Sequence, residues 1–138
     1  MSDMTQKPVF LYVEDDFASR QVLKVLITRI LGYEHLVIFE NSADFMTRLR
    51  GLERKPTIAF LDIQMRPHNG FELLNMLRQD PDYAHITVIA MTANVMSSDV
   101  EQLKASGFDG LIGKPIDNAI FPQLVTRILS GESVWYLP

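Results

Sequence analysis

Four groups of charged and hydroxyl residues in this sequence each follow closely on a short apolar run. Carboxylates follow the first and third of five such runs, a hydroxyl follows the fourth, and an ammonium group follows the fifth. The four groups are Glu14-Asp15-Asp16, Asp62, Thr92 and Lys114-Pro115. Ligands of open parallel α/β sheets bind beyond the carboxyl ends of the strands, so these side chains are expected to converge on one edge.

Together these residue types suit the transfer of a phosphoryl group to a carboxylate. Bringing Asp62 toward Glu14 and Asp15 places like charges side by side, which raises their pKa values unless a cation offsets the repulsion. Mg²⁺ prefers octahedral oxygen ligation, which Asp15, Asp62 and one backbone carbonyl just beyond Asp62 would suit. Lys114 supplies a positive point charge for Asp62 at rest and for a phosphoryl oxygen afterwards, and Thr92 supplies a hydroxyl donor. The pattern therefore predicts Asp62 as the nucleophile of a phosphoryl-binding cradle.

Each group also has a purely structural explanation. An acidic triplet after a strand is commonly a solvated loop or a helix start, Asp62 could cap a strand end, and a single lysine is most often a surface residue. The expected convergence of all four groups on one edge favours a binding site over these explanations.

The elements that must position these side chains follow from the alternation of apolar runs with segments of helical periodicity. This alternation predicts an α/β domain of five βα units around a parallel sheet. The runs are nearly continuous in Val, Ile, Leu and Phe, as expected of strands that helices cover on both faces. The predicted strands are Val9–Val13, Leu36–Phe39, Thr57–Leu61, Ile86–Met91 and Gly110–Ile112.

The helices between these strands have recognisable ends. Apolar spacing indicates a first helix over Ala18–Leu31, and Pro122 belongs in the first turn of a last helix that starts near Phe121. The glycines that stand where helices should stop are Gly32, Gly51, Gly107 and Gly131. The residues predicted to cap the second and fourth helices are Asn41-Ser42 and Ser97-Ser98-Asp99.

Composition narrows the classes of function. The chain has 138 residues, a formal net charge of −4 and no cysteine. At about 100–200 residues per domain this length fits one domain, and an acidic chain without a basic run is not expected to bind nucleic acid directly. The lack of cysteine excludes disulfides, thiolate zinc sites and a cysteine nucleophile, and no apolar stretch approaches a membrane span. We expect a cytoplasmic protein and a whole gene product, whose output passes through protein contact or phosphoryl relay.

The ordered set of Glu14-Asp15, Asp62, Thr92 and Lys114-Pro115 resembles the receiver domain of response regulators in two-component signalling, of the single-domain type. The resemblance covers residues 8–131 and leaves 132–138 as a C-terminal tail. Further motifs similar to the family are Phe60-Leu61-Asp62-Ile63-Gln64-Met65 followed by Gly70, Ile89-Ala90-Met91-Thr92-Ala93-Asn94, and Gly107-Phe108-Asp109-Gly110.

This resemblance implies a flavodoxin-like (βα)₅ fold, with a doubly wound parallel sheet of strand order 2-1-3-4-5. It implies that Asp62 accepts a phosphoryl group from a phosphohistidine of a sensor histidine kinase or histidine phosphotransfer protein. The fourth helix and fifth strand would then carry the change to a downstream protein target. The protein would be a phosphoacceptor switch and not an enzyme.

The resemblance also implies roles for the other residues of the set. The residues that organise Mg²⁺ or Mn²⁺ would be Glu14, Asp15, Asp62 and Gln64, with Asp15 and Asp62 as direct ligands and Gln64 offering its backbone carbonyl. Thr92 would move toward the phosphoryl group and Lys114 would bind it. The Lys114–Pro115 peptide would be cis.

Three features depart from the family pattern. Arg66 stands where the family usually has proline, and Pro67 comes one residue later. Leu111 replaces an aromatic residue three positions before Lys114. The tail carries the only tryptophan, Trp135, and we expect it to fold back onto its own domain, the alternative being contact with a partner or with a second copy in a homodimer.

Other classes of protein use similar residues. A phosphatase of the haloacid-dehalogenase class would need a second aspartate two residues after Asp62, where Gln64 stands, and the glycine-rich loop of a P-loop NTPase is absent. The alternative that remains is a receiver-like scaffold or adaptor that works without phosphorylation. Leu111 and Arg66 leave room for it, whereas the preserved acidic, hydroxyl and lysine residues oppose it.

Overall fold

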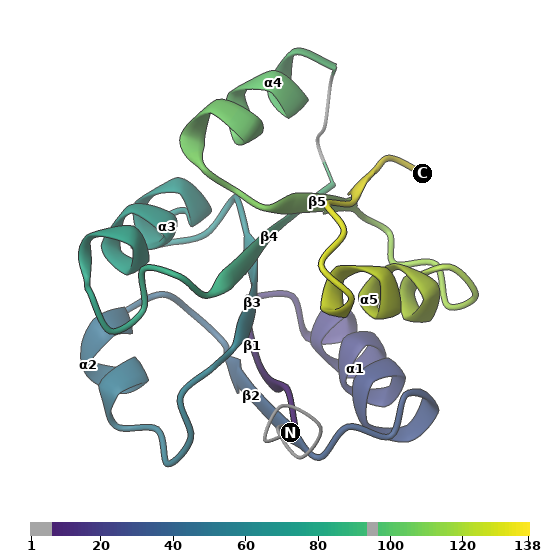
Figure 1. The fold of residues 1–138 in the computed structure, drawn as a ribbon, viewed down its shortest axis with the longest axis horizontal. Helices are drawn as coiled ribbons and strands as arrows, with labels where there is room; N and C mark the ends of the chain where they lie inside the picture. The colour runs from purple at the N-terminus through teal and green to yellow at the C-terminus, as the bar shows by residue number, and fades with distance from the viewer. Residues whose placement is uncertain (1–6, 94–96) are drawn as a thin grey trace.

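The parallel sheet and its strand order are the frame that positions the site. The computed structural model describes residues 7–93 and 97–138; Asn94, part of one family-like motif, lies outside them. Within the described residues a six-stranded sheet has the order β2-β1-β3-β4-β5-β6, and every neighbouring pair is parallel (Figure 1). The strands are β1 (Val9–Val13), β2 (His35–Phe39), β3 (Ile58–Asp62), β4 (Thr87–Thr92), β5 (Gly110–Gly113) and β6 (Trp135–Tyr136). The predicted α/β class and the order of the first five strands are confirmed.

Helices cover both faces of the sheet (Figure 1). They are α1 (Phe17–Val25), continued by a π-helical turn η2 (Leu26–Ile30), α2 (Phe45–Arg50), α3 (Gly70–Gln79), α4 (Ser97–Ser106) and α5 (Phe121–Leu129). The last helix starts at Phe121 as predicted, with Pro122 in its first turn. Among the described residues, no helix is both long and apolar enough to cross a membrane.

Glycines end most of the helices as expected. Gly32, Gly107 and Gly131 have φ angles of 77°, 104° and 99°, the left-handed region that other residues rarely adopt. Gly51 ends α2 with a right-handed φ of −80° and needs no such freedom.

The predicted cap of α2 is wrong. The helix begins only at Phe45, after Asp44 in a left-handed conformation (φ 51°). Ser42 is fully buried, and its hydroxyl accepts a hydrogen bond from the His68 backbone N–H (2.8 Å) and donates one to the His68 carbonyl (2.7 Å). Because a buried hydroxyl must find partners, Ser42 ties down the loop after β3 and caps no helix.

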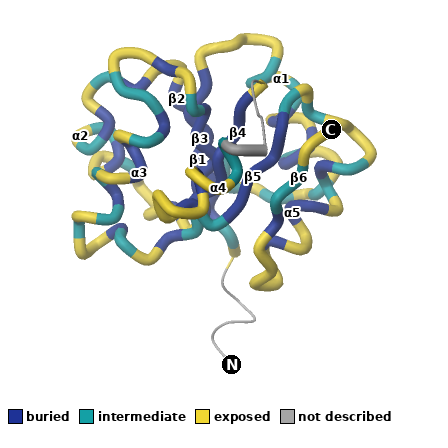
Figure 2. Tube along the Cα trace, turned by 90° about the horizontal axis from the view of Figure 1, so that it is seen from above, coloured by how far each residue is buried: buried dark blue, intermediate teal, exposed yellow. Residues whose placement is uncertain are grey.

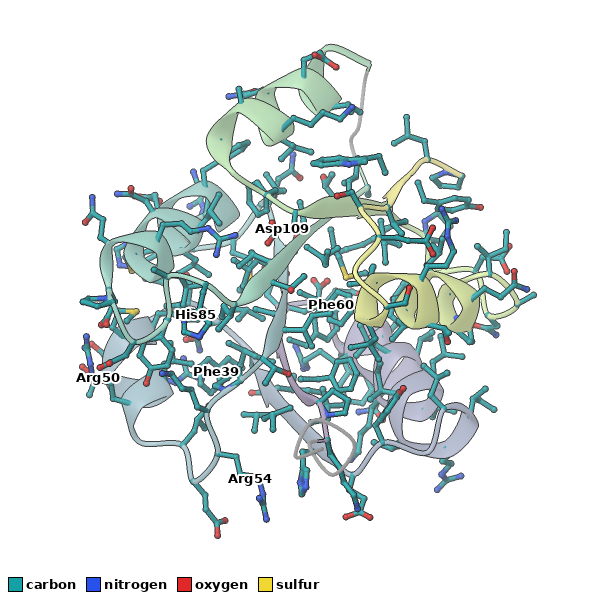
Figure 3. The ribbon with its side chains drawn as sticks, viewed as in Figure 1. Phe39, Arg50, Arg54, Phe60, His85 and Asp109 are labelled. Atoms are coloured by element: carbon teal, nitrogen blue, oxygen red, sulfur yellow. The ribbon has the colours of Figure 1, made fainter. Side chains whose placement is uncertain are left out.

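The sheet separates two apolar cores, and alternate residues of each strand enter different ones. Figure 2 shows the strands as the buried centre of the domain. Leu11 of β1 packs with α2, α3 and α4, whereas Tyr12 packs with α1 and α5. In the second core an aromatic row runs inward from α5: the ring centroids of Phe121 and Phe60 are 5.8 Å apart, and those of Phe60 and Tyr12 are 6.5 Å apart. Figure 3 shows Phe60 between the sheet and α5, and Phe39 on the α2 side.

The C-terminal tail folds back onto its own sheet. Leu111 pairs with Trp135 and Ile112 with Tyr136, and the Leu111 backbone N–H donates to the Val134 carbonyl at 2.7 Å. The tail thus adds a sixth strand beside β5, which the sequence did not indicate. The division into a domain of residues 8–131 and a tail of 132–138 stays a prediction.

Candidate functional site

The four groups of polar residues converge at the carboxyl edge of the sheet. Glu14 follows β1, while Asp62 and Thr92 are the last residues of β3 and β4. Lys114 follows β5, and its backbone N–H donates to the Thr92 carbonyl at 2.9 Å. The parallel register places Asp62 opposite Met91, one residue before Thr92.

Three carboxylates meet at this edge. Glu14, Asp15 and Asp62 each offer an oxygen, and these oxygens all lie within 4.8 Å of one another. Glu14 is completely buried and Asp62 is 5% exposed, whereas Asp15 is exposed and faces solvent. Oxygens from three carboxylates are the donors that a hard divalent cation such as Mg²⁺ prefers, so these residues fit such an ion.

Lys114 bridges the two buried carboxylates. Its Nζ lies 2.6 Å from Glu14 Oε1 and 3.5 Å from Asp62 Oδ2, and its side chain is 13% exposed. Its nearer resting partner is therefore Glu14, where the sequence led us to expect Asp62. Burial works to lower the pKa of Lys114, but the carboxylates of Glu14 and Asp62 outweigh it and raise that pKa.

The two buried carboxyl groups differ in how readily they ionise. Burial, together with the hydrogen bond and negative charge of Glu14, raises the pKa of Asp62 to about 7 despite the attraction of Lys114. Burial also acts to raise the pKa of Glu14, but hydrogen bonds involving Lys114, Asp62 and Tyr12 outweigh it and lower that pKa. Glu14 is thus the resting anion of the pair, and Asp62 is the group that an added cation would ionise.

Tyr12 and Arg20 support the acidic cluster, and sequence reasoning missed both. The Tyr12 hydroxyl donates to Glu14 Oε1 at 2.8 Å, and Arg20 Nη1 donates to the Glu14 carbonyl at 3.1 Å. Burial and the nearby Glu14 charge raise the pKa of Tyr12 well above its usual value, so the hydroxyl stays a donor. The sequence could have identified Tyr12, because residues two apart along a strand share a face, which places Tyr12 beside Glu14. Tyr12 is also the only residue of the run Val9–Val13 whose side chain carries a polar group.

The loop after β3 is built closely around Asp62. The Gln64 backbone N–H donates to Asp62 Oδ1 at 3.2 Å, which leaves Oδ2 toward Lys114. A Cβ on Gly70 would lie 2.8 Å from the Asp62 carbonyl oxygen, so only glycine fits at the start of α3.

The residues that depart from the family pattern, Arg66, Pro67 and Leu111, lie within the part of the chain that the structure describes. Arg66 is exposed, forms no ion pair with another described residue, and lines with Asp15 a surface cavity of about 490 Å³. The Lys114–Pro115 peptide is cis as the resemblance implied, and the Arg66–Pro67 peptide is also cis, which was not predicted. Leu111 is fully buried in the core on the α4 side.

Comparisons with known proteins agree with this geometry. Residues 10–127 match the response regulator receiver domain family. The polar-differentiation response regulator DivK of Brucella ovis is 34% identical over 119 residues, which cover 86% of this chain and 94% of the relative. DivK of Brucella anthropi is 30% identical over the same length and the same shares of both chains.

Solved structures show the same fold. The signal receiver domain of a DNA binding response regulator (merR) from Colwellia psychrerythraea has a TM-score of 0.78 at 24% identity and covers 90% of this chain and 99% of its own. Chemotaxis response regulator CheY4 of Vibrio cholerae has a TM-score of 0.77 at 18% identity and covers 89% and 99%. With a family match over residues 10–127 and relatives at 30–34% identity that cover most of both chains, this protein belongs to the receiver domain family of response regulators.

Proposed function

We propose that the protein is a phosphoacceptor switch in which Asp62 takes a phosphoryl group from a phosphohistidine of a sensor histidine kinase or histidine phosphotransfer protein. The observation that carries this proposal is the meeting of Glu14, Asp15 and Asp62 oxygens within 4.8 Å beside the Lys114 ammonium group. A carboxylate nucleophile, carboxylates that suit a hard cation and a lysine are the parts that phosphoryl transfer to an aspartate needs.

The transfer step is a displacement at phosphorus. An Asp62 carboxylate oxygen forms a bond to phosphorus, the bond from phosphorus to the imidazole nitrogen breaks, and that nitrogen keeps the electron pair. The product is an acyl phosphate on Asp62, and the partner's histidine leaves as neutral imidazole because the other nitrogen of its ring carries the proton. Lys114, already 3.5 Å from Asp62 Oδ2, is placed to exchange Glu14 for a phosphoryl oxygen. Thr92, at the end of the neighbouring strand, supplies a hydroxyl for the same group.

Asp15, Asp62 and the Gln64 carbonyl would hold Mg²⁺, with Glu14 as an organiser. Glu14 already accepts hydrogen bonds from Tyr12 and from the Asp16 backbone N–H and pairs with Lys114, so its role is to position the cluster. When bound, Mg²⁺ supplies positive charge that offsets the carboxylate repulsion and the charge on the phosphoryl oxygens.

Acetyl phosphate as a small phosphodonor tests the proposal. With Mg²⁺ present, intact-mass measurement should show one phosphoryl adduct on the wild-type chain and none on Asp62→Asn. Asp16→Asn is the matched control, because Asp16 caps α1 next to the cluster and asparagine keeps a cap. No adduct on the wild type, together with no Mg²⁺-dependent binding of beryllofluoride, would overturn the proposal and favour a scaffold.

A further inference from the structure

Strand β5 and the tail segment Val134–Pro138 are shaped to fit each other. A Cβ on Gly110 would lie 2.6 Å from the Val134 carbonyl oxygen, and a Cβ on Gly113 would lie 2.6 Å from Pro138 Cδ. Real Cβ atoms do not approach other heavy atoms so closely, so a side chain at either position would displace the tail. Both ends of β5 thus carry the one residue type that admits the tail.

The tail segment also packs on both faces of the sheet. Val134 is 3% exposed, Trp135 packs against the core on the α4 side, and Tyr136 packs against the core on the α5 side. Lys104 of α4 lies over the Trp135 ring, with Nζ 5.2 Å from the ring centroid. Figure 1 shows the tail returning from α5 to run beside β5, and Figure 2 shows β6 next to β5 from a second direction.

Gly113 connects the packing of the tail to Lys114, the lysine that is proposed to bind the phosphoryl group. Gly113 pairs with Thr92 of β4 and directly precedes Lys114 in the chain, and Pro138 occupies the space that a Cβ on Gly113 would need. The backbone just before Lys114 therefore lies next to both a site residue and the end of the tail. A shift of about 1 Å in such a group is enough to weaken a transfer reaction severely.

We propose that the tail segment Val134–Pro138 is a positioning element for Lys114, so that tail docking and phosphoryl binding strengthen each other. The inference rests on the proposed function, because it concerns the lysine of that same site. If the docked tail raises the affinity for a phosphoryl group by some factor, binding of that group must favour the docked tail by the same factor. A tail that only adds stability to the fold would show no such linkage.

The Leu111 amide measures tail docking directly, because it donates to the Val134 carbonyl. Hydrogen exchange is measured in the wild-type chain with Mg²⁺, with and without beryllofluoride as the phosphoryl mimic, while fluorine NMR reports whether beryllofluoride is bound. We expect the protection of the Leu111 amide to rise about fivefold to tenfold, the usual lower range of coupling between sites. The Gly51 amide, which ends α2 far from the tail, is the control and should change less.

Two changes where Pro138 meets Gly113 test whether disturbing the docked tail weakens beryllofluoride binding. Gly113→Ala should weaken beryllofluoride binding by about the same fivefold to tenfold, because the new methyl group meets Pro138. Removing Pro138 from the Gly113→Ala chain should restore most of the affinity, which a direct effect of alanine on Lys114 would not allow. Bound beryllofluoride with unchanged Leu111 protection, or no rescue, would overturn the inference and leave the proposed function intact. No binding of beryllofluoride to the wild type would overturn the proposed function itself.

Discussion

Replacing Asp62 by asparagine should make the protein more stable, even though it removes the proposed nucleophile. Burial and the charge of Glu14 raise the pKa of Asp62 from 3.8 to about 7, so the folded protein resists ionising this group. A group with a raised pKa contributes stability while it is protonated. For Asp62 that contribution is complete below pH 3.8 and is lost as the pH rises through about 7.

The size of the effect follows from linkage between ionisation and folding. Relative to a carboxyl group with an unshifted pKa, the raised pKa of Asp62 lowers the unfolding free energy by about 4 kcal/mol at pH 8. At pH 5 it lowers it by about 2 kcal/mol, because Asp62 is then ionised in the unfolded chain but protonated in the folded protein. Asparagine is neutral, nearly the same size and still able to donate a hydrogen bond to Glu14. The Asp62→Asn chain should therefore gain about 2–4 kcal/mol in unfolding free energy at pH 8, and the gain should shrink by about 2 kcal/mol at pH 5.

Urea denaturation followed by circular dichroism in metal-free buffer at the two pH values is the assay. Glu53→Gln is the control, because Glu53 is an exposed carboxylate in the loop before β3, and its substitution should have little effect at either pH. The reasoning is refuted if Asp62→Asn is no more stable than wild type at pH 8, or if its gain is the same at pH 5. Adding Mg²⁺ should stabilise the wild type and leave Asp62→Asn almost unchanged.

Three further substitutions test the supports of the site. Lys114→Met should lower the unfolding free energy, measured by urea denaturation, by about 3–5 kcal/mol, because it leaves the Glu14 charge buried without its cation. Lys114→Arg keeps a cation, so an equally large loss in that variant would contradict this reasoning. Tyr12→Phe should cost about 1–3 kcal/mol in the same assay by removing one hydrogen bond to Glu14, and an unchanged midpoint would count against it. Gly70→Ala should weaken Mg²⁺ binding at least about tenfold, because the alanine Cβ would push the Asp62 backbone carbonyl away. Calorimetric titration measures the affinity, and a wild-type value in this variant would refute the steric argument.

Most of the fold was predictable because strands buried on both faces leave continuous apolar runs. The β1 run Val9–Val13 was predicted residue for residue, and the start of α5 followed from Pro122. The tail strand was not predictable by the same rule, since β6 has two residues and pairs with a strand that two glycines shape. The position of β6 depends on its contacts with β5, which form only when the chain has folded, so no local sequence pattern predicts it.

The site was predictable as a set of residues but not as a set of contacts. Parallel strands bring their carboxyl ends to one edge, so the meeting of the carboxylates near Lys114 followed from strand order. Which carboxylate Lys114 prefers depends on burial: Glu14 is enclosed, hydrogen-bonded by Tyr12 and ionised, so it attracts the lysine more strongly than Asp62 does. Ser42 was misread because its role depends on His68, a residue 26 positions away.

The two cores on opposite faces of the sheet are connected to the acidic cluster in different ways. The aromatic row from Phe121 through Phe60 to Tyr12 ends in the hydroxyl that holds Glu14, so a substitution in α5 reaches the acidic cluster by side-chain contact. Substitutions that repack Leu49 or Leu77 in the other core have no such aromatic row to Glu14, and their energetic effects should add to those of distant changes. A substitution on the α5 side can therefore disturb Glu14 by direct contact, whereas one at Leu49 or Leu77 should change the unfolding free energy without that direct contact.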